Sequence, residues 1–308
     1  MPPTTAPHLP RPITLIINGK SRRGQSEFDT AVRFLRQAGV PLGATELSRD
    51  KAHTERVLRR EVAEGAQTVI VGGGDGTLSA CAGFLVHTSV AMGVLPLGTG
   101  NTLARSLGIP LDLEGAAQTI AIGHAEPMDV GCVNGRVFLN SVTLGLSADI
   151  AHALDSETKK RLGLLAWPVI GARVLWKHRT MVVQVTSPNK KFYTRTHQLV
   201  VSNGRYIAGP IAAAPDASVQ DSCLRVFVLG GSKFQSLART AVKWLLGQHT
   251  TAREAHYFAT RTVRVETIRR RVPADVDGEI NEHTPLDLKV LPGALRVIVP
   301  RNFEADEV

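Results

Sequence analysis

The apolar residues in the first 125 positions alternate between continuous runs and helical spacing. The runs Ile13–Ile17 and Val69–Val71 are typical of strands buried on both faces of a sheet. Elsewhere apolar residues recur every three or four positions, which is typical of amphipathic helices. Strand and helix in alternation predict a parallel sheet with right-handed crossovers. The predicted helices run from Ser26, as N-cap, to Gly39, over residues 53–64, from Asn101 to Gly108, and between Asp112 and Gly123.

The pattern changes near residue 126 to frequent two-residue alternation, which predicts an antiparallel β-sandwich. The strand-like segments lie near Asp129 and at 138–146, 181–186, 198–202, 224–229 and 263–266, with helices expected at 156–179 and 234–245. We therefore predict a flexible tail (1–12), an α/β domain (13–125), a β-sandwich domain (126–294) and a C-terminal segment (295–308) that returns to the first domain.

A glycine-rich turn follows the strand Val69–Val71 and leads into a helix. Its glycines leave the backbone open to a ligand, and the helix directs free N–H groups into the same turn. Asp75 and Thr77 are the only side chains in it that offer oxygen. Such a turn suits a phosphate with a divalent cation, held by backbone, Asp75 and Thr77. The alternative is a tight connection with glycines for packing alone. The glycines are Gly72, Gly73, Gly74 and Gly76.

A second turn with the same design lies between residues 92 and 104. It contains Pro96, Gly98, Thr99 and Gly100, and Asn101 is the predicted N-cap of the next helix. Because the carboxyl ends of parallel strands share one edge of a sheet, the two turns should lie side by side, where α/β sheets bind ligands.

Together the motifs Gly-Gly-Asp-Gly-Thr at 73–77 and Pro-Leu-Gly-Thr-Gly-Asn at 96–101 resemble the diacylglycerol kinase catalytic family, which includes sphingosine and ceramide kinases. The resemblance implies an ATP-dependent lipid kinase. It implies that the first domain (13–125) is a phosphofructokinase/NAD kinase-like nucleotide-binding domain and that the β-sandwich (126–294) is the lipid or substrate domain. It also implies Mg²⁺ at Asp75. The implied nucleotide contacts are Gly73, Gly74, Gly76, Thr77, Gly98, Thr99 and Asn101.

The loop after the first strand, Asn18–Gly24, is not a Walker A motif, because the first glycine of that motif would fall at Thr14 inside the strand. The family resemblance implies that Asn18 and Ser21 contact the nucleotide. The alternative is a basic surface turn.

Two metal sites are implied by the resemblance alone. Asp221, with the carbonyls of Ser218 and Cys223, corresponds to a structural magnesium site, although Ser222 stands where the family has glycine. The alternative for that segment is a capped β-turn. Asp129 corresponds to an acidic position that organises the active-site magnesium and water.

The segment Asp275–Glu279 resembles the Asp-Gly-Glu motif of the family, which implies Glu279 as the general base and Asp277 as the next candidate. A hairpin turn is the alternative. Thr102 stands where diacylglycerol kinases commonly have aspartate. This departure predicts weaker magnesium binding and an acceptor other than diacylglycerol.

Composition indicates the kind of partner and the cellular location to expect. A net charge of +9 and a pI near 9.8 favour an anionic partner, and no nucleic-acid-binding motif is present. The basic, Trp-containing stretch 156–179 predicts a lipid substrate met at an anionic membrane surface, or else an ordinary solvated helix face. Three scattered cysteines and no apolar run near ~20 residues predict a cytoplasmic protein peripheral to the membrane. Whether the protein forms a homodimer is left open by the sequence.

Two other functions remain as alternatives. The first is an NAD kinase-like enzyme with a soluble substrate, since the first glycine motif is shared with that family. The second is a catalytically weak regulator that binds nucleotide or lipid, which the departures at Gly19, Thr102 and Ser222 favour.

Overall fold

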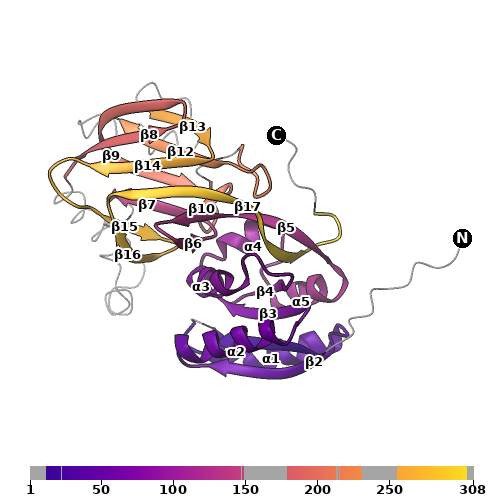
Figure 1. Ribbon diagram of the computed structural model, residues 1–308. Coiled ribbons are helices and arrows are strands. Elements are labelled where there is room, and N and C mark those ends of the chain that lie inside the picture. The colour runs from indigo at the N-terminus through magenta and orange to yellow at the C-terminus, as the bar shows by residue number, and fades with distance from the viewer. Residues whose placement is uncertain are drawn as a thin grey trace, which may run out of the picture. The chain divides into compact units, whose positions relative to one another are not determined.

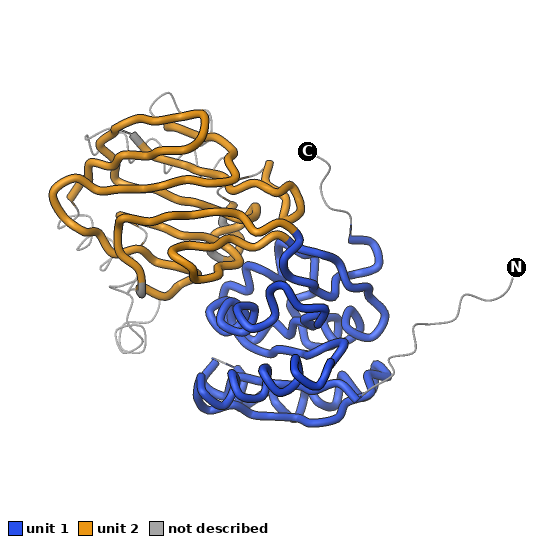
Figure 2. Tube along the Cα trace, in the orientation of Figure 1, with its two compact units in different colours: residues 1–128, 293–304 blue, residues 129–292, 305–308 orange. Residues whose placement is uncertain are grey.

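The computed structural model describes residues 12–146 except 22, residue 148, residues 179–230 except 213 and 215, and residues 255–303. The chain divides into two compact units (Figure 2). Unit 1 lies within residues 1–128 and 293–304, and unit 2 within residues 129–292 and 305–308. Apart from residue 179, the helices predicted at 156–179 and 234–245 fall outside the described residues.

Unit 1 is built on a parallel sheet with the strand order β2-β1-β3-β4-β17 (Figure 1). The β-branched runs of its central strands are fully buried, as in parallel sheets covered on both faces. The last strand comes from the far end of the sequence, because Arg296 and Val297 align with Ala91 and Met92. The strands are β1 (Ile13–Asn18), β2 (Leu42–Ser48), β3 (Thr68–Gly73), β4 (Ala91–Pro96) and β17 (Leu286–Val299).

The helices of unit 1 pack in pairs, α1 with α5 and α2 with α3. The right-handed connection through α1 leads from β1 to the edge strand β2, whereas the connections through α2 and α3 lead in the opposite direction across the sheet. Helix α1 therefore lies on one face of the sheet, and α2 and α3 lie together on the other, which explains this pairing. The helices are α1 (Gly24–Gln37), α2 (Lys51–Ala63), α3 (Asp75–Leu85), α4 (Thr102–Ser106) and α5 (Leu113–Ile122).

Two local predictions for unit 1 are wrong. Helix α1 begins at Gly24, so Ser26 lies inside the first turn and its hydroxyl donates to the Arg23 carbonyl instead of capping the helix. Strand β2 was not predicted. It is an edge strand whose residues are mostly partly exposed, so it lacks the apolar run that marks a buried strand.

Unit 2 is antiparallel wherever its strand pairs are described. Its main order is β16-β15-β7-β9-β8-β14-β17, with β12 pairing to β9 and β13, and β5 pairing to β6. The strands are β5 (His124–Val133), β6 (Arg136–Phe138), β7 (Ser141–Gly145), β8 (Met181–Ser187), β9 (Lys190–Ser202), β10 (Tyr206–Ala208), β11 (Ile211–Ala212), β12 (Leu224–Gly230), β13 (Ala255–Thr260), β14 (Thr262–Thr267), β15 (Pro273–Val276) and β16 (Glu279–His283).

The long strand β9 links the two layers of unit 2. Its residues 190–196 pair with β8, whereas residues 198–202 pair with both β7 and β12. A large buried cluster rich in valine and leucine, with Phe138 at 0% exposure, forms a core in unit 2, and a smaller cluster contains Val200, Phe227 and Leu229. The predicted fold class is therefore confirmed: a parallel α/β part precedes an antiparallel β part.

Several boundaries inside unit 2 differ from the predictions. The strand predicted at 198–202 begins at Lys190, and β13, β15 and β16 were not predicted. The segment 138–146 was expected as one strand, but β6 ends at Phe138 and β7 begins at Ser141. The backbone between them turns to bind a carboxylate, as described below. Among the described helices, none combines the length and apolar character needed to cross a bilayer.

Candidate functional site

The two glycine turns of unit 1 lie against each other at the carboxyl ends of β3 and β4, as predicted. Gly73 aligns with Pro96 across the strand pair, and the Leu97 N–H donates to the Gly73 carbonyl at 3.0 Å. A Cβ added to Gly98 would lie 2.5 Å from the Cα of Gly74. Glycine is therefore required at this contact, because a side chain would separate the two turns.

Thr77 joins the first loop of the chain to this pair of turns. The Asn18 side chain donates to the Thr77 hydroxyl at 2.8 Å, and the Ser21 hydroxyl donates to the Asn18 carbonyl at 2.7 Å. Gly24 closes the loop, since a Cβ there would lie 2.1 Å from the Asn18 carbonyl oxygen. The structure thus brings Asn18, Ser21 and Thr77 together beside the glycine turns, at the N-terminus of α3.

Asp75 is the first residue of α3 and faces the start of α4. Its carboxylate accepts a hydrogen bond from the Thr102 hydroxyl at 3.1 Å and one from the Leu103 N–H at 3.2 Å. Asp75 remains partly exposed, whereas Thr102 is 2% exposed. A carboxylate can accept about four hydrogen bonds or ligand contacts, so Asp75 keeps free capacity.

Asn101 does occupy the N-cap position of α4, but its side chain does not cap the helix. The residue has φ +49°, and its Oδ1 accepts from the Gly98 N–H at 2.8 Å. Its amide group donates to the Pro96 carbonyl at 3.4 Å. Asn101 therefore holds the second turn closed, while Thr99 and Gly98 form its outer part.

In unit 2, Asp277 organises the backbone between β6 and β7. Its carboxylate accepts from the N–H groups of Leu139, Asn140 and Ser141 at 2.6, 2.9 and 3.0 Å. Asp277 is 8% exposed and has φ +51°. A carboxylate so fully engaged with backbone donors has a clear structural role.

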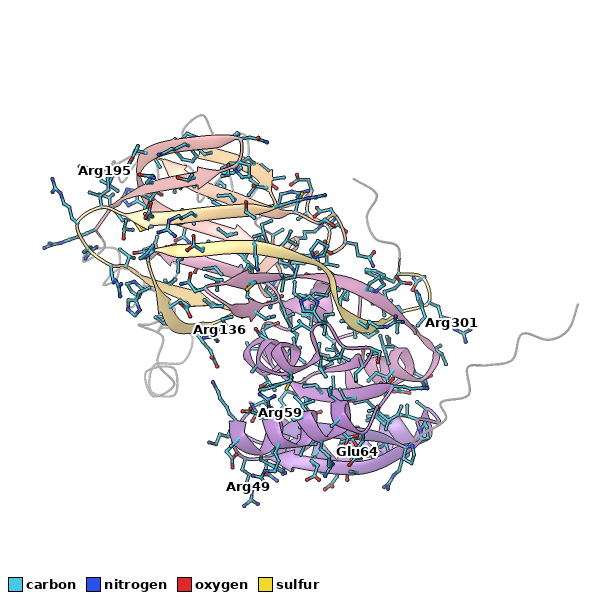
Figure 3. The ribbon with its side chains drawn as sticks, viewed as in Figure 1. Arg49, Arg59, Glu64, Arg136, Arg195 and Arg301 are labelled. Carbon is cyan, nitrogen blue, oxygen red and sulfur yellow. The ribbon has the colours of Figure 1, made fainter. Side chains whose placement is uncertain are left out.

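Glu279 lies two residues further on, at the start of β16, and is more accessible. Its side chain is 30% exposed and forms an ion pair of 2.9 Å with Arg136, which is labelled in Figure 3. Neighbouring Asp275 accepts from the Gly278 N–H at 2.7 Å. Burial raises the pKa of the Asp275 carboxyl, and the charge of Glu279 adds to the rise, although the Gly278 hydrogen bond opposes it. The hairpin therefore presents Glu279 and keeps Asp277 and Asp275 internal.

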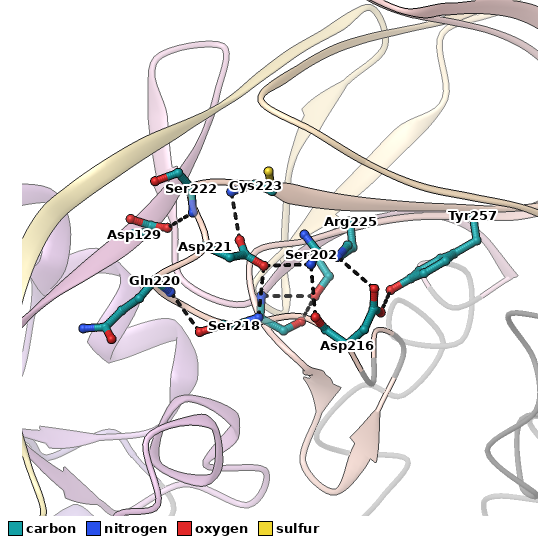
Figure 4. A network of polar contacts seen from close by, with 11 residues as sticks. Asp129, Ser202, Asp216, Ser218, Gln220, Asp221, Ser222, Cys223, Arg225 and Tyr257 are labelled. Atoms are coloured by element: carbon teal, nitrogen blue, oxygen red, sulfur yellow. Dashed lines mark hydrogen bonds and ion pairs between the residues drawn. The ribbon is translucent and has the colours of Figure 1, made fainter. Parts of the chain in front are cut away.

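The segment around Asp221 holds a buried cationic side chain (Figure 4). Asp221 Oδ2 lies 2.8 Å from Arg225 Nη2, and the Arg225 side chain is 5% exposed. The same carboxylate accepts from the N–H groups of Ser218 and Cys223 at 3.2 and 2.9 Å. The arginine supplies the positive charge that a cation would supply. Magnesium binding by Asp221, Ser218 and Cys223 stays a prediction, and these contacts do not favour it.

Asp216 and Tyr257 extend this network. The Tyr257 hydroxyl donates to Asp216, and the Arg225 guanidinium contacts the Asp216 carboxylate at 3.3 Å. Burial would raise the pKa of Asp216, but the hydrogen bond from Tyr257 and the charge of Arg225 lower it overall. Burial and Asp216 together raise the pKa of Tyr257. Sequence reasoning missed Arg225 and Asp216, although a charged residue in the apolar strand 224–229 was a usable signal.

Asp129, on β5, is 3% exposed and supports the same segment. Its Oδ2 accepts from the Ser222 N–H at 2.6 Å, and its backbone N–H donates to the Val219 carbonyl at 2.7 Å. Ser222 has φ +56°, in the left-handed region that favours glycine. This conformation explains why a glycine would suit position 222. The part of the chain that the structure describes contains no cluster of three or more His, Cys, Asp or Glu residues able to hold a metal.

A cavity of about 470 Å³ in unit 1 lies at the opposite end of the sheet from the glycine turns. It is lined at the amino ends of the strands by Thr14, Gly43 and Thr68, by Arg60 of α2, and by Glu64, which directly follows that helix. Since none of the predicted site residues lines it, this cavity is separate from the candidate site.

Comparison with known proteins identifies the class. Residues 12–133 match the diacylglycerol kinase catalytic domain, and residues 140–299 match the YegS C-terminal NAD kinase β-sandwich-like domain. The chain therefore belongs to the diacylglycerol kinase-like family that joins these two domains, and it is a kinase with an alcohol acceptor. The family prediction is confirmed.

Individual relatives match over most of their length. The chain is 30% identical to "Probable lipid kinase YegS-like" from Pseudomonas aeruginosa (strain UCBPP-PA14), over 94% of each protein. It is 29% identical to "Diacylglycerol kinase" from Bacillus subtilis (strain 168), covering 76% of this chain and 78% of the relative. A crystal structure of a diacylglycerol kinase from Bacillus anthracis str. Sterne superimposes with a TM-score of 0.75 at 25% identity, covering 94% and 96% of the two chains.

Proposed function

We propose that this protein is an ATP-dependent lipid kinase that transfers the γ-phosphoryl group to a lipid hydroxyl. The observation that carries the proposal is the contact between the two glycine turns beside the N-terminus of α3. Backbone N–H groups at a helix N-terminus favour phosphate, and glycine lets a phosphate approach the backbone closely. Relatives named as lipid and diacylglycerol kinases support the choice of acceptor.

The first loop and the glycine turns divide the binding work. Gly73, Gly74, Gly76 and Gly98 supply backbone, while Thr77 and Thr99 supply hydroxyl groups for the nucleotide. Asn18 and Ser21 support the turns through Thr77 and the loop backbone. Asn101 keeps the second turn in its binding conformation. Phosphoryl transfer depends chiefly on such positioning and on charge neutralisation.

Asp75 is the candidate magnesium ligand on this unit. Its remaining oxygen capacity and the neighbouring Thr77 hydroxyl are the hard donors that Mg²⁺ prefers, with substrate phosphates completing the shell. The residues present therefore fit the ion. When bound, magnesium would neutralise charge on the phosphates. Asp129 stays a second candidate, although its Oδ2 already accepts from Ser222.

Glu279 is the proposed general base. It is accessible, and Arg136 fixes its position by an ion pair. The Asp277 carboxylate accepts from three backbone N–H groups, which argues for a structural role. One carboxylate that accepts the hydroxyl proton is sufficient for this chemistry.

The decisive experiment supplies radiolabelled ATP with total lipid extract and, in a parallel reaction, with NAD, and identifies the labelled product. Asp75→Asn should reduce labelling at least ~10²-fold while the fold is kept, because the amide oxygen can still accept from Leu103. The matched control is Asp112→Asn, an exposed N-cap where asparagine caps equally well, so labelling should not change. Labelling of NAD instead of lipid would favour the NAD kinase-like alternative, and ATP binding without any labelled product would favour a regulator.

We further propose that the enzyme acts from the cytoplasmic side as a peripheral membrane protein. A lipid acceptor requires contact with a bilayer, and the net charge of +9 favours an anionic one. Vesicle-embedded and detergent-dispersed lipid, compared at rising salt, test this: only the activity on anionic vesicles should fall.

A further inference from the structure

One face of unit 2 combines exposed apolar side chains with unpaired basic charge. In β8, β9 and β14, alternate residues point into the core, and the others form the opposite face. Across this outer face Tyr193 aligns with Gln184 and Glu266. Arg195 aligns with Val182, whose carbonyl accepts from the Ile268 N–H at 3.0 Å. Tyr193, Arg195 and Ile268 are therefore neighbours on one surface, which we call the outer face.

Two of its side chains are unusually exposed for their size. Tyr193 is 59% exposed and Ile268 is 46% exposed. Within the described residues, Ile122 of unit 1, at 49%, is the other large hydrophobic residue of this kind. A large apolar side chain at a loop tip, next to basic residues, is a feature of surfaces that enter a lipid interface.

Basic residues surround these two side chains. Three consecutive arginines, Arg269–Arg271, follow Ile268 directly and are all exposed. Lys191 and Arg195 flank Tyr193 on β9, and Figure 3 shows Arg195 on that strand. None of these five side chains forms an ion pair with another residue in the described ranges. Their charge is available to an external partner.

The acidic residues of the outer face are partly neutralised. Glu266 and Asp287 share one partner, Arg264, at 3.1 and 2.6 Å, so these three groups leave a single negative charge beside five basic side chains. The surface that remains is therefore positively charged around two apolar side chains, and it complements a surface with dense negative charge and an accessible apolar layer.

We propose that the outer face docks on an anionic lipid bilayer, with Ile268 and Tyr193 in the headgroup region and Arg269–Arg271 against lipid phosphates. The proposal builds on the lipid kinase function only in the choice of a bilayer as the occupant. Each basic residue near an anionic membrane strengthens binding roughly five-fold, so the three arginines contribute about 10²-fold.

The charge test measures sedimentation of the full chain with phosphatidylcholine vesicles, with and without phosphatidylglycerol, in the absence of ATP. Replacing Arg269–Arg271 together by glutamine should lower partitioning onto the anionic vesicles by about 10²-fold. The matched control replaces Arg36, Arg49 and Arg56 by glutamine. These exposed residues of unit 1 carry the same total charge, and the control should bind nearly as well as wild type. Equal losses in the two triple variants, or no wild-type binding, would overturn the proposal.

The apolar test uses Ile268→Ser, with Ile122→Ser as its matched control. Only Ile268→Ser should weaken vesicle binding, by about ten-fold for the loss of one inserted side chain. If Ile268→Ser instead converts a dimer to a monomer in sedimentation velocity without altering vesicle binding, the face joins two copies of the chain and the proposal is wrong. Turnover on detergent-dispersed total lipid extract is measured in parallel. A variant with normal turnover but lost vesicle binding supports docking through the outer face. If the wild type binds vesicles but shows no turnover, the result counts against the kinase function and leaves the docking proposal standing.

Discussion

Replacing Arg225 by methionine tests whether a protein side chain neutralises the Asp221 segment. The Arg225 side chain is 5% exposed and Asp221 is 13% exposed, so the substitution leaves a carboxylate buried without its counter-charge. Removing one partner of a buried ion pair costs about 3–5 kcal/mol. Asp216, at 53% exposure, is solvated and adds little. For a unit of this size, such a loss lowers the Tm by about 6–20 °C.

Thermal unfolding of the wild type, Arg225→Met, Asp221→Asn and the double variant measures this effect. The double variant should be more stable than the sum of the single losses predicts, because each single variant leaves its partner unpaired. EDTA should not change the Tm of the wild type. The reasoning would be refuted if Arg225→Met lost less than about 1 kcal/mol of unfolding free energy, or if EDTA clearly lowered the wild-type Tm. Either result would indicate that a cation is bound at Asp221.

Three further predictions concern the candidate site. Thr102→Asp replaces the hydroxyl that donates to Asp75 by a second carboxylate, so the Tm of the variant should fall in EDTA and be restored by magnesium. The variant should also need a lower magnesium concentration than the wild type for half-maximal activity. An unchanged magnesium dependence would leave Thr102 as a helix-start residue. Glu279→Gln should lower turnover ~10²–10⁴-fold with unchanged stability, whereas Asp277→Asn should lose about 1–3 kcal/mol of stability, because an amide N–H would face backbone donors; the reverse pattern, seen in kinetics and urea unfolding, exchanges their roles. Because the pKa of Asp275 is raised on folding, its contribution to stability is present below the unfolded pKa near 3.8 and lost as pH rises through the folded value, so Asp275→Asn should raise the Tm at pH 7 but not below pH 3.8; an equal gain at both pH values would contradict this.

The parts of unit 1 that could be predicted depend on short-range signals. The runs 13–17 and 69–71, the glycine turns and the helix between Asp112 and Gly123 are each indicated by a few neighbouring residues, and the structure has all of them. Strand β2 was missed because it is held by its neighbour β1 and has no buried run of its own. Its place in the sheet follows from long-range pairing that local pattern does not encode.

The carboxylates of unit 2 show the same limit. Asp277 can bind the backbone of residues 139–141 only because chain segments about 137 positions apart meet in space. Likewise, Asp129 supports Ser222 across 93 positions. The motifs identified these aspartates as notable, but only the fold distinguishes a carboxylate that orders backbone from one, such as Glu279, that stays accessible.

The return of β17 to unit 1 has a consequence for biosynthesis. On the ribosome, β4 emerges roughly 200 residues before Arg296 and Val297, its partners in the sheet, which corresponds to about 10–40 s of translation. Throughout that interval the edge of β4, with its buried Met92 and Val94, has no strand to cover it. The first unit to be synthesised is therefore the last to be completed, and a nascent or truncated chain that stops before residue 293 presents this edge to other chains.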